Sequence, residues 1–262
     1  MYTSNPLWHE LLWQQVQRLE HEHLDLLIDA TSLNYPLLQE LASLVDGPEL
    51  AKLFDHTPEA AIADAGPLLL RLQARHQPWL KAFFSAVDCT QHVLALLSPW
   101  RFDALAAHLS RCTQAQWNQG REQGVLRYYD PRLFLPVSEA LTPAQGRVLH
   151  GPVIAWHWLD RDHRAQQLLG HYSRHSDAPT AEGFLFDSAQ VASLKAWADA
   201  DWHRREHSAT PQHYGLSREE GLMRHLFHSQ MAACQQGLQE PHERQAFIRQ
   251  WLLDNSPFVV DE

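Results

Sequence analysis

Short aliphatic runs are the feature that most limits how this sequence can fold. LDLLIDAT (24–31), GPLLLRL (66–72) and HVLALLS (92–98) are far too short to cross a membrane, but each has the length and composition of a buried strand. Segments with helical spacing of their apolar residues lie between these runs. The alternation of strand-like and helix-like segments continues to about residue 172 and predicts an α/β fold with a mixed sheet and flanking helices.

The remaining segments of this region follow from capping residues, proline and periodicity. A first helix over 6–23 has Asn5 as its N-cap and Pro6 at its first position. A short helix after Thr142 begins with Pro143, and LFLPVSEAL can start another. The other expected helices cover 35–45, 77–87 and 100–117, and the other expected strands cover 49–55, 124–130, 152–160 and 163–172.

The pattern changes after about residue 187. Three segments there have a 3.6-residue apolar period, with expected N-caps at Asp187, Ser217 and Glu240, the last followed by a proline. The polar segment 173–186 separates the alternating strand and helix segments from these three helical segments. The sequence therefore predicts an α/β domain over 1–172, a linker over 173–186 and an all-helical lobe over 187–262.

Composition narrows the classes of function. The chain has 262 residues and a formal net charge of -10, and both of its halves are acidic, which disfavours nucleic acid as a direct partner. Three widely spaced cysteines support neither a disulfide framework nor a zinc knuckle. No secretory signal or membrane span is apparent, so we expect a cytoplasmic protein that does not contact a membrane.

One motif raises the alternative of a zinc-dependent peptidase. His203, Glu206 and His207 fit the pattern H-x-x-E-H, in which two histidines on one helix face bind zinc and the glutamate activates a water. The motif stands near the end of the chain, a Thr-Pro pair soon ends its helix, and 18 histidines make a chance match easy. We therefore favour a polar helix face and expect no catalytic residues, no metal and no cofactor. No nucleophile elbow, phosphate loop or dinucleotide fingerprint occurs.

Ten tryptophans favour a protein-binding role slightly, because tryptophan is enriched in interfaces as well as in cores. Trp156 and Trp158 share one face of an expected strand, where core packing is the simplest interpretation. Trp197, Trp202 and Trp251 lie on the expected C-terminal helices. They are candidate partner-binding residues if they are exposed, although core packing is again the simpler alternative.

The most unusual cluster is LRYYDPRLFLPV (126–137). Its six adjacent residues Arg127, Tyr128, Tyr129, Asp130, Pro131 and Arg132 could form an active site or a rigid turn. Proline holds the preceding residue extended and can start a helix, and an aspartate there can accept backbone N–H groups or pair with either arginine. We therefore predict a structural role, with a direct partner contact as the alternative.

The order of these segments resembles the bacterial family called domain of unknown function 4123, the adaptor chaperones of type VI secretion effectors. The resemblance covers about 24–160 and is carried by LDLLIDATSLNYPLLQEL (24–41), GPLLLRL (66–72) and LRYYDPRLFLPVSEALTPAQGRVLHGPVIAW (126–156). Tyr128 is a mild departure, because family members often have Phe-Tyr where this sequence has Tyr128-Tyr129. The resemblance implies no catalytic residues.

The resemblance implies a non-enzymatic adaptor in the cytoplasm of a Gram-negative bacterium. Such a protein binds a toxic effector as cargo and loads it onto the VgrG spike for export, and a divergent helical lobe suits a role in cargo choice. Two alternatives stay open: the zinc peptidase, and a domain that binds a single protein without a role in secretion.

Overall fold

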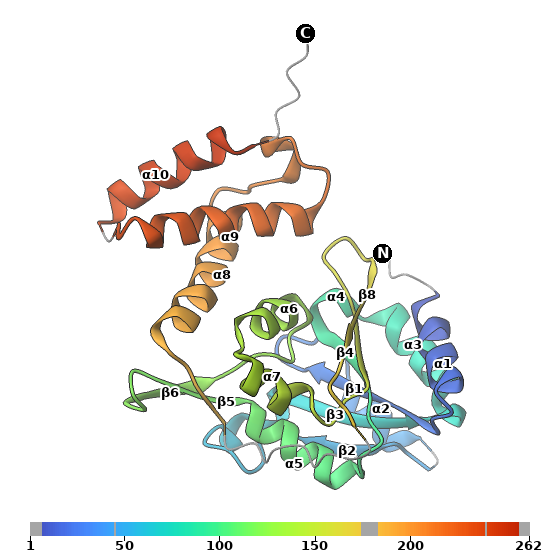
Figure 1. Ribbon diagram of the computed structural model, residues 1–262. Coiled ribbons are helices and arrows are strands. Elements are labelled where there is room, and N and C mark those ends of the chain that lie inside the picture. The colour runs from blue at the N-terminus through green and yellow to red at the C-terminus, as the bar shows by residue number, and fades with distance from the viewer. Residues whose placement is uncertain (1–6, 45, 174–182, 239, 257–262) are drawn as a thin grey trace. The chain divides into compact units, whose positions relative to one another are not determined.

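The computed structural model describes residues 7–44, 46–173, 183–238 and 240–256 (Figure 1). The chain divides into two compact units, Met1–Leu185 and Phe186–Glu262. The first contains two sheets with flanking helices and the second contains three long helices. This arrangement confirms the predicted fold class of an α/β lobe followed by a helical lobe.

The elements of the first unit follow the predicted alternation. Its helices are α1 (Trp8–Arg18), α2 (Leu37–Ser43), α3 (Gln77–Ala86), α4 (Cys89–His92), α5 (Phe102–Cys112), α6 (Pro131–Ala140) and α7 (Pro143–His150), with 3₁₀ turns η1 (Ala60–Ala65) and η2 (Ala74–His76). Its strands are β1 (His23–Asp29), β2 (Glu49–Lys52), β3 (Pro67–Gln73), β4 (Val93–Leu97), β5 (Gln114–Trp117), β6 (Glu122–Val125), β7 (Ala155–Leu159), β8 (Ala165–Leu169) and β9 (Phe184–Leu185).

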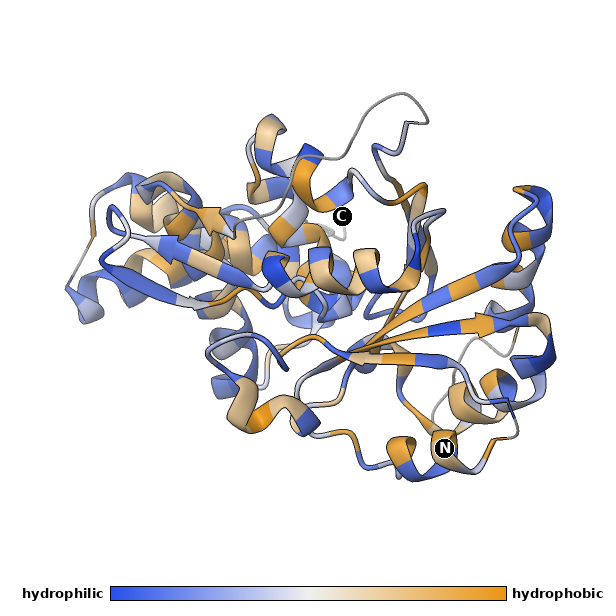
Figure 2. Cartoon of the chain, turned by 90° about the horizontal axis from the view of Figure 1, so that it is seen from below, coloured by the Kyte–Doolittle hydropathy of each residue, from blue (hydrophilic) through white to orange (hydrophobic). Residues whose placement is uncertain are grey.

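Six strands form the main sheet in the order β2-β3-β1-β4-β7-β8, and every neighbouring pair is antiparallel. The three aliphatic runs are the adjacent central strands β3, β1 and β4. A parallel pairing occurs in the smaller sheet β6-β5-β9, where β5 and β9 run in the same direction. In Figure 2, orange hydrophobic residues recur along the strands of the main sheet.

Both faces of the central strands β3, β1 and β4 are buried, which explains why these strands are aliphatic rather than alternating. Leu26 and Ile28 of β1 lie in a core cluster with residues of α1, α2 and α3. On β7, Trp156 and Trp158 are both buried, and the ring of Phe134 from α6 lies 5.0 Å and 5.1 Å from theirs. Core packing of these two tryptophans is therefore what the structure shows.

A buried ion pair crosses the sheet between β1 and β3. Asp25 and Arg71 are register partners, and the guanidinium Nε and Nη2 donate to the two carboxylate oxygens over 2.7 Å and 2.9 Å. Asp25 is fully buried, and Arg71 also lies over the ring of Phe102 from α5. Bidentate pairing of this kind compensates for the loss of hydration of both charges.

Several predicted boundaries were wrong, among them that of the helix expected over 6–23, which ends at Arg18. The helix expected over 100–117 ends at Cys112, and residues 114–117 instead form β5 between β6 and β9. The strand expected over 124–130 is β6, which ends at Val125. These two short strands pair with each other across residues 118–121, and their largely polar sequences QAQW and EQGV lack the apolar pattern by which the other strands are recognised. The expected strand 49–55 is also shorter, since β2 ends at Lys52.

The second unit consists of α8 (Ser188–Glu206), η3 (Pro211–Tyr214), α9 (Glu219–Gln235) and α10 (Pro241–Asp254). Asp187 caps α8 as predicted, accepting from the N–H of Gln190. The cap expected at Ser217 lies one residue later, at Arg218, and the cap expected at Asn5 falls outside the described residues. Of the predicted linker, 174–182 also fall outside them, while Phe184 and Leu185 pair with β5.

Candidate functional site

The cluster Arg127–Arg132 forms the connection from β6 into α6. Asp130 is the N-cap of α6: its Oδ1 accepts from the backbone N–H of Arg132 over 3.0 Å, and Pro131 occupies the first helical position. Proline suits this position because its missing N–H would have no partner within the helix. The sequence prediction of a proline-fixed turn with a capping aspartate describes this geometry.

The two arginines of the cluster form ion pairs with the buried carboxylates of Asp29 and Asp130. Arg132 donates from Nε and Nη2 to Asp130 over 2.9 Å and 2.8 Å. Arg127 donates from Nη2 to Asp29 over 2.7 Å and to Asp130 over 3.3 Å. Since Asp29 is the last residue of β1, this network ties the end of a central strand to the start of α6 across 98 residues of sequence.

Exposure differs sharply within this network. The two carboxylates are 2 % exposed, whereas the side chains of Arg127 and Arg132 are 40 % and 37 % exposed. Burial lowers the pKa of Arg127, but the hydrogen bond and charge of Asp29 outweigh it and raise that pKa above its ordinary value. The network thus presents two permanently cationic groups to solvent while it buries their counter-ions.

The two tyrosines of the cluster are core residues. Tyr128 is fully buried and its hydroxyl donates to the carbonyl of Leu109 in α5 over 2.8 Å. Tyr129 packs edge-on against Phe54. Burial raises the pKa of both hydroxyls, so both are neutral at physiological pH.

A polar pocket of about 490 Å³ opens beside the cluster. Arg127, Arg132 and Asp29, the last residue of β1, form part of its wall. The other lining residues belong to the loop after β1 and to the region of α4. The further lining residues are Thr31, Ser32, Leu33, Asn34, Ala86, Val87, Asp88, Gln91 and His92.

Two polar groups of this pocket lie within hydrogen-bond distance of backbone carbonyls. Thr31 donates from Oγ1 to the carbonyl of Ala65 over 3.1 Å, and Nδ1 of His92 lies 2.9 Å from the carbonyl of Asp29. The pocket therefore offers fixed polar groups and two cations suited to recognising a polar or charged segment. No local sequence pattern indicates this pocket, because Asp29 and the residues of α4 are far from the cluster along the chain. An aspartate that ends an aliphatic run was the available signal.

The histidine motif lies at the end of α8, where His207 is the C-cap. His203 is half-buried and His207 is exposed, and their ring centroids lie 4.4 Å apart. Burial, assisted by His207, lowers the pKa of His203 to about 4. Within residues 7–44, 46–173, 183–238 and 240–256, no group of three or more His, Cys, Asp or Glu side chains is arranged to hold a metal ion.

The three candidate tryptophans of the helical unit have different environments. Trp197 is 3 % exposed and stacks on Phe227 with ring centroids 4.7 Å apart, so it is a core residue and is not available to a partner. Trp251 is partly buried against the same core and lies beside His225. Trp202 is 58 % exposed and lines a pocket, which makes it the strongest candidate contact of the three.

None of the described helices is long and apolar enough to cross a membrane. Comparison with curated proteins and with solved structures yields no match. Comparison with family models yields one match, which runs from β1 into α7 and contains the whole Arg127–Arg132 cluster, but stops before the helical unit. Residues 26–148 thus match the family described as "Domain of unknown function (DUF4123)".

Proposed function

We propose that this protein is a cytoplasmic adaptor that binds a type VI secretion effector and loads it onto the VgrG spike. The observation that carries the proposal is the agreement between the DUF4123 match over 26–148 and the segments in which the sequence resembles effector adaptors. In this reading the α/β unit is the family's common scaffold, and its effector and VgrG partners are proteins rather than small molecules.

The geometry of the cluster supports this assignment of roles. Its most distinctive residues, Arg127 and Asp130, join β1 to α6, so the family-like sequence maintains the fold at the point where the chain leaves the smaller sheet. The exposed arginine faces and the adjoining polar pocket leave room for a second role in partner contact.

The helical unit lies outside the family match and differs in character from the scaffold. Its exposed Trp202 is the kind of residue that contributes strongly to protein interfaces. We propose that this unit selects the cargo while the α/β unit supplies the common framework. An adaptor must also release its cargo, so we expect an interface of standard size with a partly polar character.

Affinity purification from the native cell tests this function. A tagged chain should retain an effector and VgrG above the level found with an untagged strain, as identified by mass spectrometry. Removal of the gene should leave the effector unstable or not exported. Normal export of all effectors from a clean deletion strain would contradict the proposal, whatever proteins the tagged chain retains.

Metal analysis tests the peptidase alternative separately. A bound equivalent of zinc that is lost from a His203→Ala variant would favour it over the adaptor.

A further inference from the structure

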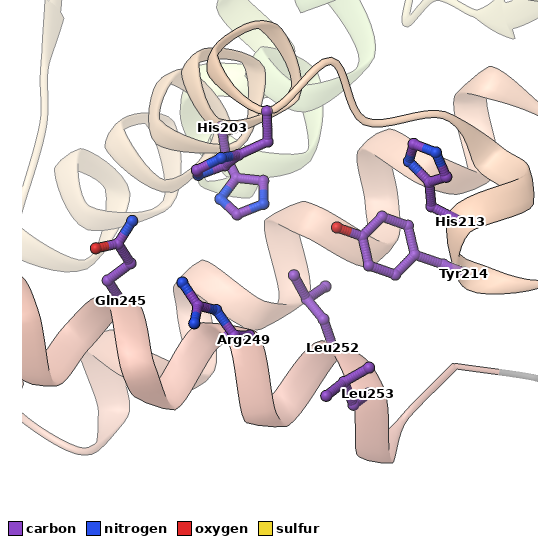
Figure 3. Close-up of a pocket in the computed structure, with 8 residues that line it drawn as sticks. His203, His213, Tyr214, Gln245, Arg249, Leu252 and Leu253 are labelled. Atoms are coloured by element: carbon purple, nitrogen blue, oxygen red, sulfur yellow. The ribbon is translucent and has the colours of Figure 1, made fainter.

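Two pockets of the helical unit, of about 270 Å³ and 350 Å³, adjoin along α8 and α10. They share His203, His207 and Gln245, so they form neighbouring parts of one groove, which we call the α8–α10 groove. Figure 3 shows the first pocket, with His203 opposite Gln245 and Arg249 of α10, and with Tyr214 across from Arg249.

The groove is cationic although its unit is acidic. Lys195 and Arg249 line it, are exposed, and have no ion-pair partner among the residues that the structure describes. A third cation, Arg244, is held in place by Gln230 over 2.8 Å and by Asp199 over 3.4 Å. Asp199 is the one carboxylate in the lining of either pocket, whereas residues 186–262 carry more Asp and Glu than Lys and Arg.

Apolar surface accompanies these charges. Trp202 borders the second pocket and Leu253 borders the first, and they are 58 % and 51 % exposed. Ile248 and Leu252 line the groove from the core of the unit, where both are buried. An aromatic side chain and aliphatic carbons between cations provide an apolar anchor together with electrostatic selection.

We infer that the α8–α10 groove binds an acidic protein segment that carries apolar side chains. Lys195 and Arg249 pair with its carboxylates, and Trp202 packs against an apolar side chain between them. The chemistry favours a protein over a nucleic acid, because the chain as a whole has a net charge of -10 and would repel an extended polyanion. The identification of this segment as part of an effector rests on the proposed adaptor function, but the binding itself does not.

Fluorescence anisotropy with the full chain tests the inference. The probe is a fluorescein-labelled peptide that repeats Glu-Leu-Glu-Glu-Phe-Glu, and the comparison peptide repeats Lys-Leu-Lys-Lys-Phe-Lys. We expect the acidic probe to bind, the basic one not to bind, and the affinity to fall as salt is added. The double variant Lys195→Glu, Arg249→Glu should bind the acidic probe at least about tenfold more weakly, and Trp202→Ala should also weaken it.

A matched double variant provides the control. Lys81→Glu, Arg121→Glu changes the net charge equally, but both residues are exposed on the first unit. It should bind the probe as the wild type does. Thermal melting by circular dichroism establishes that each variant remains folded.

The inference would be overturned by failure of the acidic probe to bind, or by equal loss of binding in the control variant. Tighter binding of single-stranded DNA with the same dependence on Lys195 and Arg249 would also overturn it, in favour of a polyanion site. Groove binding and adaptor function can fail separately. Peptide binding together with normal effector export in the deletion strain would refute the adaptor function but not the groove binding. Failure of the peptide to bind together with loss of effector export would refute the groove binding but not the adaptor function.

Discussion

Replacement of Asp130 tests whether the Arg127–Arg132 cluster is a structural connection. In Asp130→Ala, α6 loses its N-cap and both arginines lose a buried acceptor. Loss of an N-cap costs about 0.5–2 kcal/mol. The ion pairs add only about 0.2–1 kcal/mol each, because both guanidinium groups are more than a third exposed and can return to water, and Arg127 keeps Asp29.

These contributions predict a loss of about 2–3 kcal/mol from the free energy of unfolding. For a unit of this size that corresponds to a decrease in melting temperature of roughly 5–10 °C. Asp130→Asn is the informative companion, since its amide oxygen can still cap α6 while the charge is lost. We expect it to cost about 1 kcal/mol, less than the alanine variant.

Urea unfolding followed by tryptophan fluorescence measures both variants, because Trp156 and Trp158 pack against Phe134 of α6 and report on this region. A double-mutant cycle with Arg132→Ala isolates the pair. If Asp130→Ala changed the free energy of unfolding by less than about 0.5 kcal/mol, the structural interpretation would be refuted. Loss of partner binding at unchanged stability would instead identify the cluster as a contact surface.

Three further predictions follow from burial. Trp197→Ala should destabilise the helical unit by about 3–5 kcal/mol, whereas Trp202→Ala should change its stability by less than about 0.5 kcal/mol, as measured by chemical unfolding. Burial lowers the pKa of His157 to about 4, below its ordinary value of 6.5. The stability that goes with its neutral form is therefore fully present above about pH 6.5 and is lost as the pH falls towards 4. His157→Leu should flatten the dependence of melting temperature on pH between pH 6.5 and 4, and an unchanged slope would contradict this. Arg71→Leu should cost about 3–5 kcal/mol because it removes the bidentate partner of the buried Asp25 and leaves only His23, 3.8 Å away, near that carboxylate. Adding Asp25→Leu should restore much of that loss, and an equal or greater loss in the double variant would argue against the pair.

The aliphatic runs 24–31, 66–72 and 92–98 predicted their own structure well, because β1, β3 and β4 are buried on both faces and composition alone identifies such strands. What the sequence could not show is their antiparallel order, with β1 between β3 and β4. The short strand β5 was also missed, because its sequence QAQW is largely polar and neither its hairpin pairing with β6 nor its parallel pairing with β9 is marked by an apolar run.

In the candidate site, too, local contacts could be predicted from the sequence and long-range contacts could not. The cap and ion pairs of Asp130 could be predicted because their partners are two and three residues away. The bond from Arg127 to Asp29 and the polar pocket beside it could not, because they arise only when β1 and α6 are brought together. Among the tryptophans, periodicity did not distinguish the buried Trp197 from the exposed Trp202, which are five positions apart on the same helix.

Effector export from a strain that lacks this protein tests the adaptor function most directly. We expect one effector to disappear from the culture medium while the secretion apparatus still exports other effectors, and we expect the wild-type gene to restore the missing one. Export of every effector at the wild-type level in the deletion strain would contradict it.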